Sequence, residues 1–73
     1  MDTWEKLVGR HQADVKTLVL HLLGPEEVED VTQEVFMRAF RSLSGFRGDC
    51  SFATWLYHIT VNLCRDRLRR RQT

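Results

Sequence analysis

The sequence predicts an all-α fold, a compact three-helix domain with a loop between the second and third helices. Apolar residues recur at spacings of three and four over about residues 2–23, 25–43 and 51–70, and this is the period of one face of an α-helix. Glycine and serine interrupt the pattern at 44–50, which predicts the loop. The 73 residues are enough for one small domain, so we expect it to span 1–73.

The first predicted helix is mostly scaffold. Its apolar stripe consists of Trp4, Leu7, Val8, His11, Val15, Leu18, Val19 and Leu22. Gly24 and Pro25 end it, because glycine suits a helix C-cap and proline cannot continue the hydrogen-bond ladder. His11 has no second ligand four residues away, so we interpret it as a histidine at the edge of the core rather than a metal ligand.

The second predicted helix has an acidic start and two different faces. Its first turns are rich in glutamate and aspartate, which the helix dipole favours there. Its core side consists of Val28, Val31, Val35, Ala39 and Leu43, flanked by Phe36 and Phe40. The opposite side consists of Asp30, Gln33, Glu34, Met37 and Arg41. This side is either a solvated face or a partner-binding face, and Met37, an adaptable apolar side chain among polar ones, favours the second interpretation.

The third predicted helix carries residues suited to nucleic acid. Ser51 is its expected N-cap, and its two apolar faces consist of Phe52, Leu56, Ile59 and Leu63, and of Tyr57, Val61, Cys64 and Leu68. The strip that remains consists of Ser51, His58, Asn62, Arg65 and Arg69, with Trp55 and Asp66 at its edge. Such aromatic, amide and arginine side chains can stack on bases, read base edges and contact phosphates. The alternative is a solvated flank that ends in a basic tail.

The charges divide the chain into an acidic half and a basic half. Residues 1–36 carry eight acidic side chains and three basic ones, whereas residues 37–73 carry eight arginines and two aspartates. This asymmetry suggests two different partners, one of them polyanionic.

Several function classes find no support in the sequence. Cys50 and Cys64 could approach His58, but no metal-ligand spacing is present, so we expect reduced thiols and no metal site. No nucleophile and base pair or phosphate loop is present, so neither an enzyme nor a cofactor site is predicted. The chain has no apolar run of about 20 residues and no signal-peptide character, so we expect a soluble, cytoplasmic protein without membrane contact.

Three parts of the stretch from Glu29 to Arg71 carry a family resemblance: EDVTQEVF with RAF, the FRGDCSF loop, and ATWLYHITVN followed by RDRLRRR. In this order and spacing they resemble region 2 of bacterial sigma factors, closest to the extracytoplasmic-function branch. The resemblance implies a domain that binds RNA polymerase and recognises the promoter −10 element in transcription initiation. The loop at 44–50 would then be a recognition loop.

The resemblance implies two sets of site residues. In the family the second helix docks on the coiled coil of the polymerase β′ subunit, and the Asp-x-x-Gln-Glu pattern matches Asp30, Gln33 and Glu34, with Met37, Arg38 and Arg41 at its margin. A base of the non-template single strand is turned out of the stack into a pocket between the loop and the third helix. By position, the pocket residues would be Phe46, Arg47, Asp49, Ser51 and Phe52 from the loop side and Trp55, His58 and Asn62 from the helix. The residues expected to hold phosphates are Arg65, Arg67, Arg69, Arg70 and Arg71, although Arg67 and Arg70 lie nearer the core side.

The chain also departs from the family pattern. Leu56 stands where primary sigma factors carry a second tryptophan, so we expect weak intrinsic melting of DNA. Cys50 and His58 stand where serine and arginine are common, which leaves the base preference of the pocket open. The chain ends where a sigma factor of this branch enters a linker, and the helix-turn-helix that reads the −35 element does not follow. We expect an excised domain; the alternative is an unusual minimal protein.

Two hypotheses of function follow. The leading one is a promoter-recognition module that binds the β′ subunit and single-stranded −10 DNA. Anti-sigma factors are frequent regulators in this family, so such a protein could be a further partner. The alternative is a helical protein-interaction module that has the same fold but does not bind DNA. The promoter sequence, the regulon and the oligomeric state do not follow from the sequence.

Overall fold

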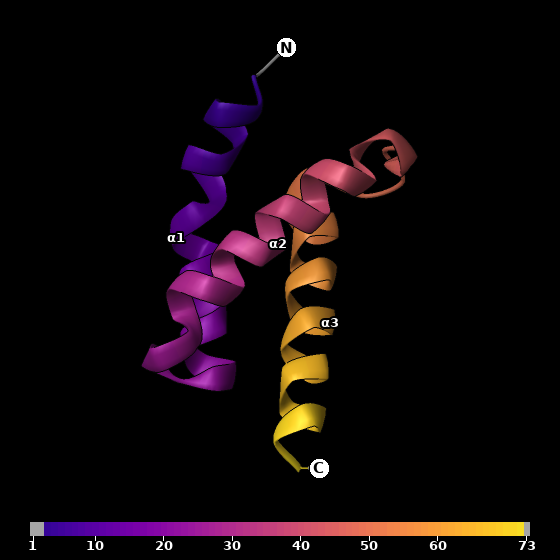
Figure 1. Cartoon of the computed structure of the whole chain (residues 1–73). Helices are drawn as coiled ribbons and strands as arrows, with labels where there is room; N and C mark the ends of the chain where they lie inside the picture. Colours follow the sequence, from indigo (N-terminus) through magenta and orange to yellow (C-terminus); the bar gives the residue numbers. More distant parts are fainter. Residues whose placement is uncertain (1–2, 73) are drawn as a thin grey trace.

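A computed structural model describes residues 3–72, which fold into three α-helices joined by short turns (Figure 1). The bounds of the helices are Trp4–Leu23 for α1, Val28–Ser42 for α2 and Phe52–Gln72 for α3. Two single 3-10 turns flank α2, η1 at Pro25–Glu27 and η2 at Leu43–Gly45. Residues 3–72 contain no strand, so the predicted all-α class is confirmed. None of the helices within that range is both long and apolar enough to cross a membrane.

The helices pack around one small core. Each helix contacts the other two, and α2 crosses in front of α1 and α3 in Figure 1. The buried core consists of Val15, Val19, Leu23, Val31, Val35, Phe36, Ala39, Leu56, Leu63 and Cys64. Full burial of one large aliphatic or aromatic side chain stabilises the fold by roughly 1.5–3 kcal/mol, so these few residues supply most of the favourable free energy.

Local hydrogen bonds fix both ends of α1. The Thr3 hydroxyl accepts a hydrogen bond from the Lys6 N–H at 3.3 Å and caps the first turn. Gly24 ends the helix with a φ of 93°, a left-handed value that suits glycine, and its N–H donates to the Leu20 carbonyl at 2.9 Å. The chain can therefore turn sharply after α1 and start towards α2.

The boundaries of the second and third helices differ from the predicted ones. The α-helix begins at Val28 rather than near Pro25, and η2 takes in the first residues of the predicted loop. Short 3-10 turns are common at helix ends, where backbone groups lack α-helical partners. α3 continues to Gln72, beyond its predicted end. The predicted start of the first helix at residue 2 lies outside the described residues.

Burial departs from the helical pattern at the edges of each apolar stripe. Phe40, Leu22 and Tyr57, which the pattern assigned to the core side, are 58%, 38% and 53% exposed. Leu23 is buried in place of Leu22, because it continues the row of residues four apart that faces α2 and α3. A three-helix domain covers only a narrow stripe of each helix, so the side chains at the margins stay accessible.

Candidate functional site

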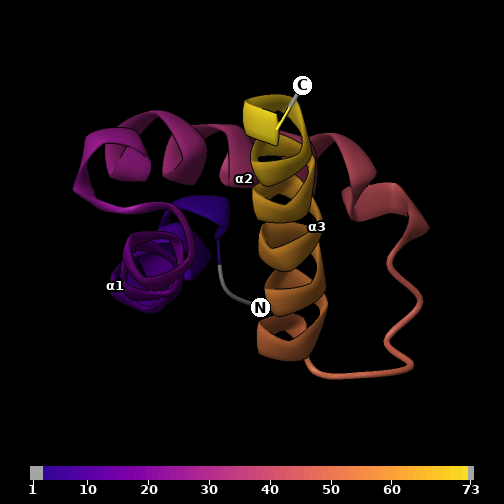
Figure 2. The same cartoon turned by 90° about the horizontal axis from the view of Figure 1, so that it is seen from below.

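The loop between α2 and α3 forms a small hollow against the first turns of α3. In Figure 2 the chain swings out from the end of α2 and returns to the start of α3. The Phe46 ring stacks on Trp55, with ring centroids 4.8 Å apart and planes inclined by 27°. The hollow measures about 290 Å³ and is lined by Gly45, Phe46, Arg47, Asp49, Cys50 and Trp55. This volume is near the lower end for ligand pockets, about 300–1,000 Å³.

Two local features give the loop its shape. Gly48 has a φ of 79°, a left-handed conformation that other residues rarely adopt, so glycine permits the turn between Arg47 and Asp49. The Ser51 hydroxyl accepts a hydrogen bond from the Thr54 N–H at 3.1 Å and caps α3, as the sequence predicted. The cap fixes where the loop ends and hence where Trp55 lies relative to it.

Four of the predicted DNA-binding side chains meet at the hollow: Phe46, Arg47, Asp49 and Trp55. The Ser51 hydroxyl is occupied locally instead, because it accepts the cap hydrogen bond and donates to the Thr54 hydroxyl at 3.0 Å. The contact of Ser51 with DNA therefore stays a prediction, while its role in starting α3 is visible in the hydrogen bonds.

Phe52 lies in an aromatic cluster that supports the hollow. Its ring centroid is 6.2 Å from that of Trp4, 5.2 Å from that of His11 and 5.7 Å from that of Trp55. Aromatic pairs in such inclined geometries stabilise by about 0.5–1.5 kcal/mol beyond their area burial. Phe52 thus joins the start of α3 to α1, and a direct contact with a base stays a prediction for it too.

The remaining predicted DNA-binding residues follow one side of α3 from the hollow towards its C-terminal end. This strip consists of His58, Asn62, Arg65 and Arg69, all exposed and at helical spacing. Within residues 3–72 the Asn62 side chain has no hydrogen-bond partner. Arg69 pairs with Asp66 at 3.0 Å, an exposed pair of a kind that contributes about 0–1 kcal/mol. A ligand could therefore engage the whole strip at little cost.

Two arginines expected to hold phosphates have acidic partners inside the domain. Arg67 Nη1 lies 3.0 Å from Glu27 Oε1, and Arg67 Nη2 lies 3.6 Å from Glu34 Oε2. Arg71 Nη2 donates to Glu27 Oε2 and, at 3.1 Å, to the Leu23 carbonyl. Both guanidiniums lie beside the acidic turn between α1 and α2, because the C-terminal turns of α3 pass it. A phosphate contact of either arginine stays a prediction.

The outer side of α2 carries the predicted polymerase-binding residues. The exposed members of this set are Asp30, Gln33, Met37, Arg38 and Arg41. Met37 is 49% exposed. A single exposed apolar side chain is ordinary, but Met37 lies beside exposed Phe40 on one groove, and such a continuous apolar surface suits a partner. Glu34 is only half-exposed, because one of its carboxylate oxygens faces Arg67.

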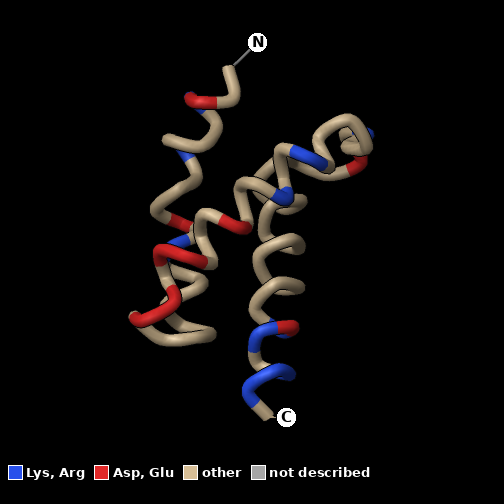
Figure 3. Tube along the Cα trace, in the orientation of Figure 1, with Lys and Arg blue, Asp and Glu red and all other residues tan. Residues whose placement is uncertain are grey.

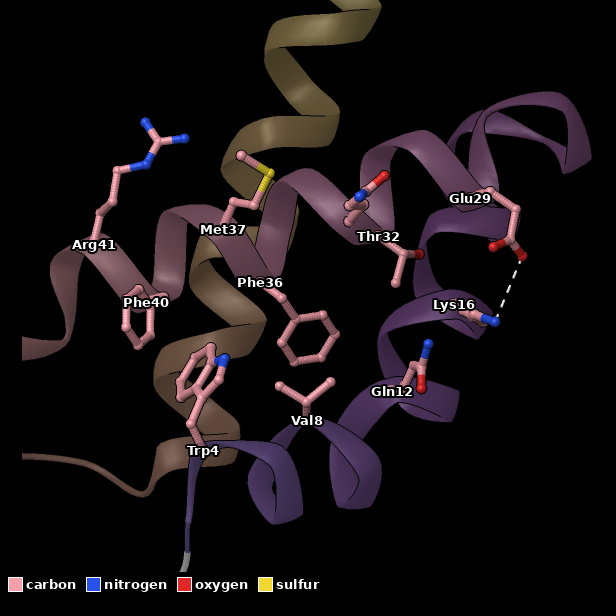
Figure 4. A pocket seen from close by; sticks show the side chains of 11 residues that line it. Trp4, Val8, Gln12, Lys16, Glu29, Thr32, Phe36, Met37, Phe40 and Arg41 are labelled. Carbon is pink, nitrogen blue, oxygen red and sulfur yellow. Dashed lines mark ion pairs between the residues drawn. The ribbon is translucent and has the colours of Figure 1, made fainter.

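A groove between α1 and α2 adjoins this face (Figure 4). It measures about 800 Å³, and its apolar walls consist of Trp4 and Val8 from α1 and Phe36, Met37 and Phe40 from α2. The ion pair between Lys16 and Glu29, at 3.5 Å, bridges the two helices at one end. The buried Thr32 hydroxyl lines the groove and has no hydrogen-bond partner within the described residues. Sequence reasoning missed the α1 side of this groove, because the helix crossing decides which α1 residues face α2.

Opposite charges gather on different elements, which meet at the ion pairs of Glu27 with Arg67 and Arg71. In Figure 3 the acidic residues cluster at the turn between α1 and α2 and along the first half of α2, whereas arginines occupy the end of α3. The charge asymmetry read from the sequence therefore becomes a spatial one. Within residues 3–72, no group of three His, Cys, Asp or Glu side chains could hold a metal ion.

The two cysteines lie in different environments. Cys50 is exposed at the hollow, and Cys64 is buried in the core. Burial raises the pKa of the Cys64 thiol, and the nearby Arg67 guanidinium opposes this rise in part. Cys64 therefore behaves as a small apolar side chain of the core.

Comparisons with known proteins agree in family and fold. Residues 7–73 match the family model for Sigma-70 region 2. The ECF RNA polymerase sigma-E factors of Escherichia coli (strain K12) and Haemophilus influenzae are 47% and 42% identical over 62 residues, which is 85% of this chain and 32% and 33% of those proteins. The chain thus spans about a third of the length of the curated relatives it matches. An NMR structure of an engineered region 2 of sigmaE in complex with GTAAAA has a TM-score of 0.84 at 38% identity, and covers 93% of this chain and 72% of that chain.

Proposed function

Because the chain belongs to the Sigma-70 region 2 family, we propose that it recognises the promoter −10 element and binds RNA polymerase in transcription initiation. The observation that carries this proposal is the hollow at Phe46 and Trp55, which continues into an exposed strip of base-reading and basic side chains on α3. The similar structure of sigmaE region 2 is a complex with GTAAAA, which supports single-stranded DNA as the ligand.

At the DNA surface, one base of the non-template strand leaves the stack and enters the hollow. The Phe46 and Trp55 rings offer it apolar, stacking surfaces, each such contact being worth about 1–3 kcal/mol, and this offsets part of the unstacking cost. Arg47 and Asp49 supply donors and acceptors for its edge. Further along α3, Asn62 and His58 reach neighbouring bases.

Phosphates of the same strand contact the basic end of the strip. Arg65 and Arg69 supply charge and donors there, and these contacts orient the strand without reading its sequence. The pair between Arg69 and Asp66 is exposed, so a phosphate can replace the carboxylate. Ser51, the cap of α3, and Phe52, its first residue, support this surface: Ser51 starts the helix and Phe52 packs beside Trp55.

At the protein surface, α2 docks on the coiled coil of the polymerase β′ subunit. The proposed contact residues are Asp30, Gln33, Glu34, Met37, Arg38 and Arg41. Charged and amide groups fix the register, and exposed Met37 beside the apolar groove supplies area that a partner can remove from water.

We propose no catalytic step for the domain and no cofactor. A protein that binds polymerase works in the cytoplasm, and an anti-sigma factor is a further proposed partner.

A titration with single-stranded DNA tests the DNA surface. The probes are a labelled oligonucleotide containing GTAAAA and one of the same composition in scrambled order. Replacing Asn62 with alanine should weaken binding of the GTAAAA probe by about twofold to tenfold, because one hydrogen bond is lost. The preference for this probe over the scrambled one should also fall. Gln12→Ala, an exposed amide on α1, is the control and should change neither.

Two outcomes would count against this surface. Equal affinity of the unaltered protein for both probes would show that this surface does not recognise the DNA sequence. Absence of any binding at low salt would favour the alternative of a protein-interaction module with the same fold.

Binding to core RNA polymerase tests the α2 surface separately. The double variant Gln33→Ala with Glu34→Ala should bind the core enzyme more weakly in a fluorescence titration, because two of the polar groups that set the register are lost. Gln72→Ala with Asp14→Ala, an exposed amide and an exposed carboxylate outside α2 and outside the groove, measures any general effect of removing these two groups. Equal polymerase affinities of the two double variants would contradict the assignment of α2 to the polymerase interface.

A further inference from the structure

Glu27 joins the acidic turn before α2 to the basic end of α3. It accepts hydrogen bonds from Arg67 at 3.0 Å and from Arg71, and these partners are 40 and 44 positions away in the chain. Arg71 also donates to the Leu23 carbonyl at the end of α1. One carboxylate in the turn between α1 and α2 thus holds two of the arginines that terminate α3.

This cluster is more shielded than an ordinary surface ion pair. The side chains of Glu27 and Arg67 are 24% and 27% exposed, whereas those of Arg69 and Asp66 are 76% and 44% exposed. Salt screens partly buried pairs less than exposed ones, and several charges in one network hold better than an isolated pair. Arg67 is therefore harder for a phosphate to capture than Arg65 or Arg69, and Arg71, although 45% exposed, is held by hydrogen bonds to both Glu27 and the Leu23 carbonyl.

The difference matters because phosphate contacts raise affinity for every sequence equally. If all arginines at the end of α3 were available, charge alone would bind any single strand, and the bases in the hollow would contribute a smaller share. Keeping two guanidiniums on a carboxylate lowers the sequence-independent part of the binding free energy and leaves the base contacts unchanged.

We propose that Glu27 is a specificity-determining residue: by pairing with Arg67 and Arg71 it keeps them from nucleic-acid phosphates, so that binding depends on the base-reading hollow. This role rests on the proposed function of α3 as the DNA surface. It acts through the two arginines, so Glu27 itself touches no nucleotide.

The test is the salt dependence of single-strand binding by Glu27→Gln. The variant keeps the size of the side chain and removes the charge that holds the guanidiniums. The slope of log affinity against log salt for the scrambled oligonucleotide should steepen by about 0.7 for each arginine released. The ratio of affinities for the GTAAAA and scrambled probes should fall. Glu26→Gln is the matched control, since it removes the same charge from an exposed neighbour.

Equal slopes and equal affinity ratios in Glu27→Gln and Glu26→Gln would overturn the proposal. A loss of stability in Glu27→Gln, with the slope unchanged, would also overturn it and leave the cluster a structural contact only. Equal affinities of the unaltered protein for the GTAAAA and scrambled probes would instead refute base recognition. The salt slopes of the two variants would still show whether Glu27 holds the arginines.

A second pair of variants keeps the proposal testable if Glu27→Gln does not fold. Arg71→Gln should leave the salt slope as it is, because this arginine is already paired within the domain. Arg65→Gln, which removes an exposed arginine of the strip, should reduce the slope by about 0.7. A reduction of similar size in Arg71→Gln would show that phosphate reaches Arg71 and would contradict the proposal.

Discussion

Single side chains at the hollow combine structural and binding roles. Trp55 stacks on Phe46 and packs beside Phe52, so the ring proposed to meet a base also links the loop to the helix. Asn62 has no such partner within residues 3–72. Its substitution therefore separates binding from folding more cleanly than a substitution at Trp55.

The two cysteines give a residue-scale prediction. Cys50 is exposed and Cys64 is 1% exposed, and the thiolate is the reactive form. A chromogenic thiol reagent should modify one thiol of the folded protein rapidly and the second only on unfolding. Cys50→Ala should abolish the rapid phase, and rapid modification of both thiols in the folded state would contradict the burial of Cys64.

The same burial predicts a dependence of stability on alkaline pH. The pKa of Cys64 is raised in the fold, so keeping this thiol protonated contributes to the free energy of unfolding. The contribution is complete below the unfolded pKa of about 8.5. It is lost as the pH rises from that value to the folded pKa, because the unfolded chain releases the proton first. Urea midpoints measured from pH 7 to pH 10 should fall less steeply in Cys64→Ala than in Cys50→Ala.

At the scale of one element, α3 depends on its first turn. The Ser51 cap satisfies the Thr54 N–H, which would otherwise lack a partner at the start of the helix. The cap also brings the loop and Trp55 together, so local hydrogen bonding at one residue sets the shape of the hollow.

Removing this cap has a measurable cost. Ser51→Ala should lower the free energy of unfolding by about 1 kcal/mol, within the usual range of about 0.5–2 kcal/mol for N-caps, as measured by urea denaturation. Ser44→Ala, in the η2 turn, is the control, because no hydrogen bond of its side chain is present in residues 3–72. Equal unfolding free energies for both variants would argue that the hydrogen bond at Thr54 does not stabilise α3.

At the scale of the whole molecule, stability depends on a small shared core. Domains of this size have about 0.05–0.15 kcal/mol of stability per residue, and most of the stability of each helix comes from its packing against the others. Leu56 of α3 is 2% exposed in the cluster that joins all three helices. Loss of packing at Leu56 should therefore destabilise all three helices.

Leu56→Ala tests that dependence. The variant should lose about 2–5 kcal/mol of unfolding free energy, and the helical signal should disappear in one urea transition. Leu20→Ala, at a position that is 45% exposed on α1, should change stability by no more than about 0.5 kcal/mol. Similar losses in both variants would contradict the packing described for the core.

Much of the fold and part of the site were predictable from helical periodicity. The spacing of Asn62 and Arg65 put them on one side of a helix, and the structure has both exposed there. Leu22, predicted in the apolar stripe of the first helix, and Phe40, predicted at the flank of the core, are both exposed. Periodicity gives a direction on one helix and not the width of its contact with the next. The groove beside Met37 was missed for a related reason, since half of it comes from α1.

The sequence by itself determined the three helices, the caps at Gly24 and Ser51 and the order of chemical groups along each face, because these depend on interactions between residues one to four positions apart. Only the tertiary structure decided which arginines of α3 are paired. Arg67 meets Glu27 across 40 positions of chain, and such contacts follow from the crossing of helices around the core. That geometry separates the arginines that face solvent from those held beside the acidic turn.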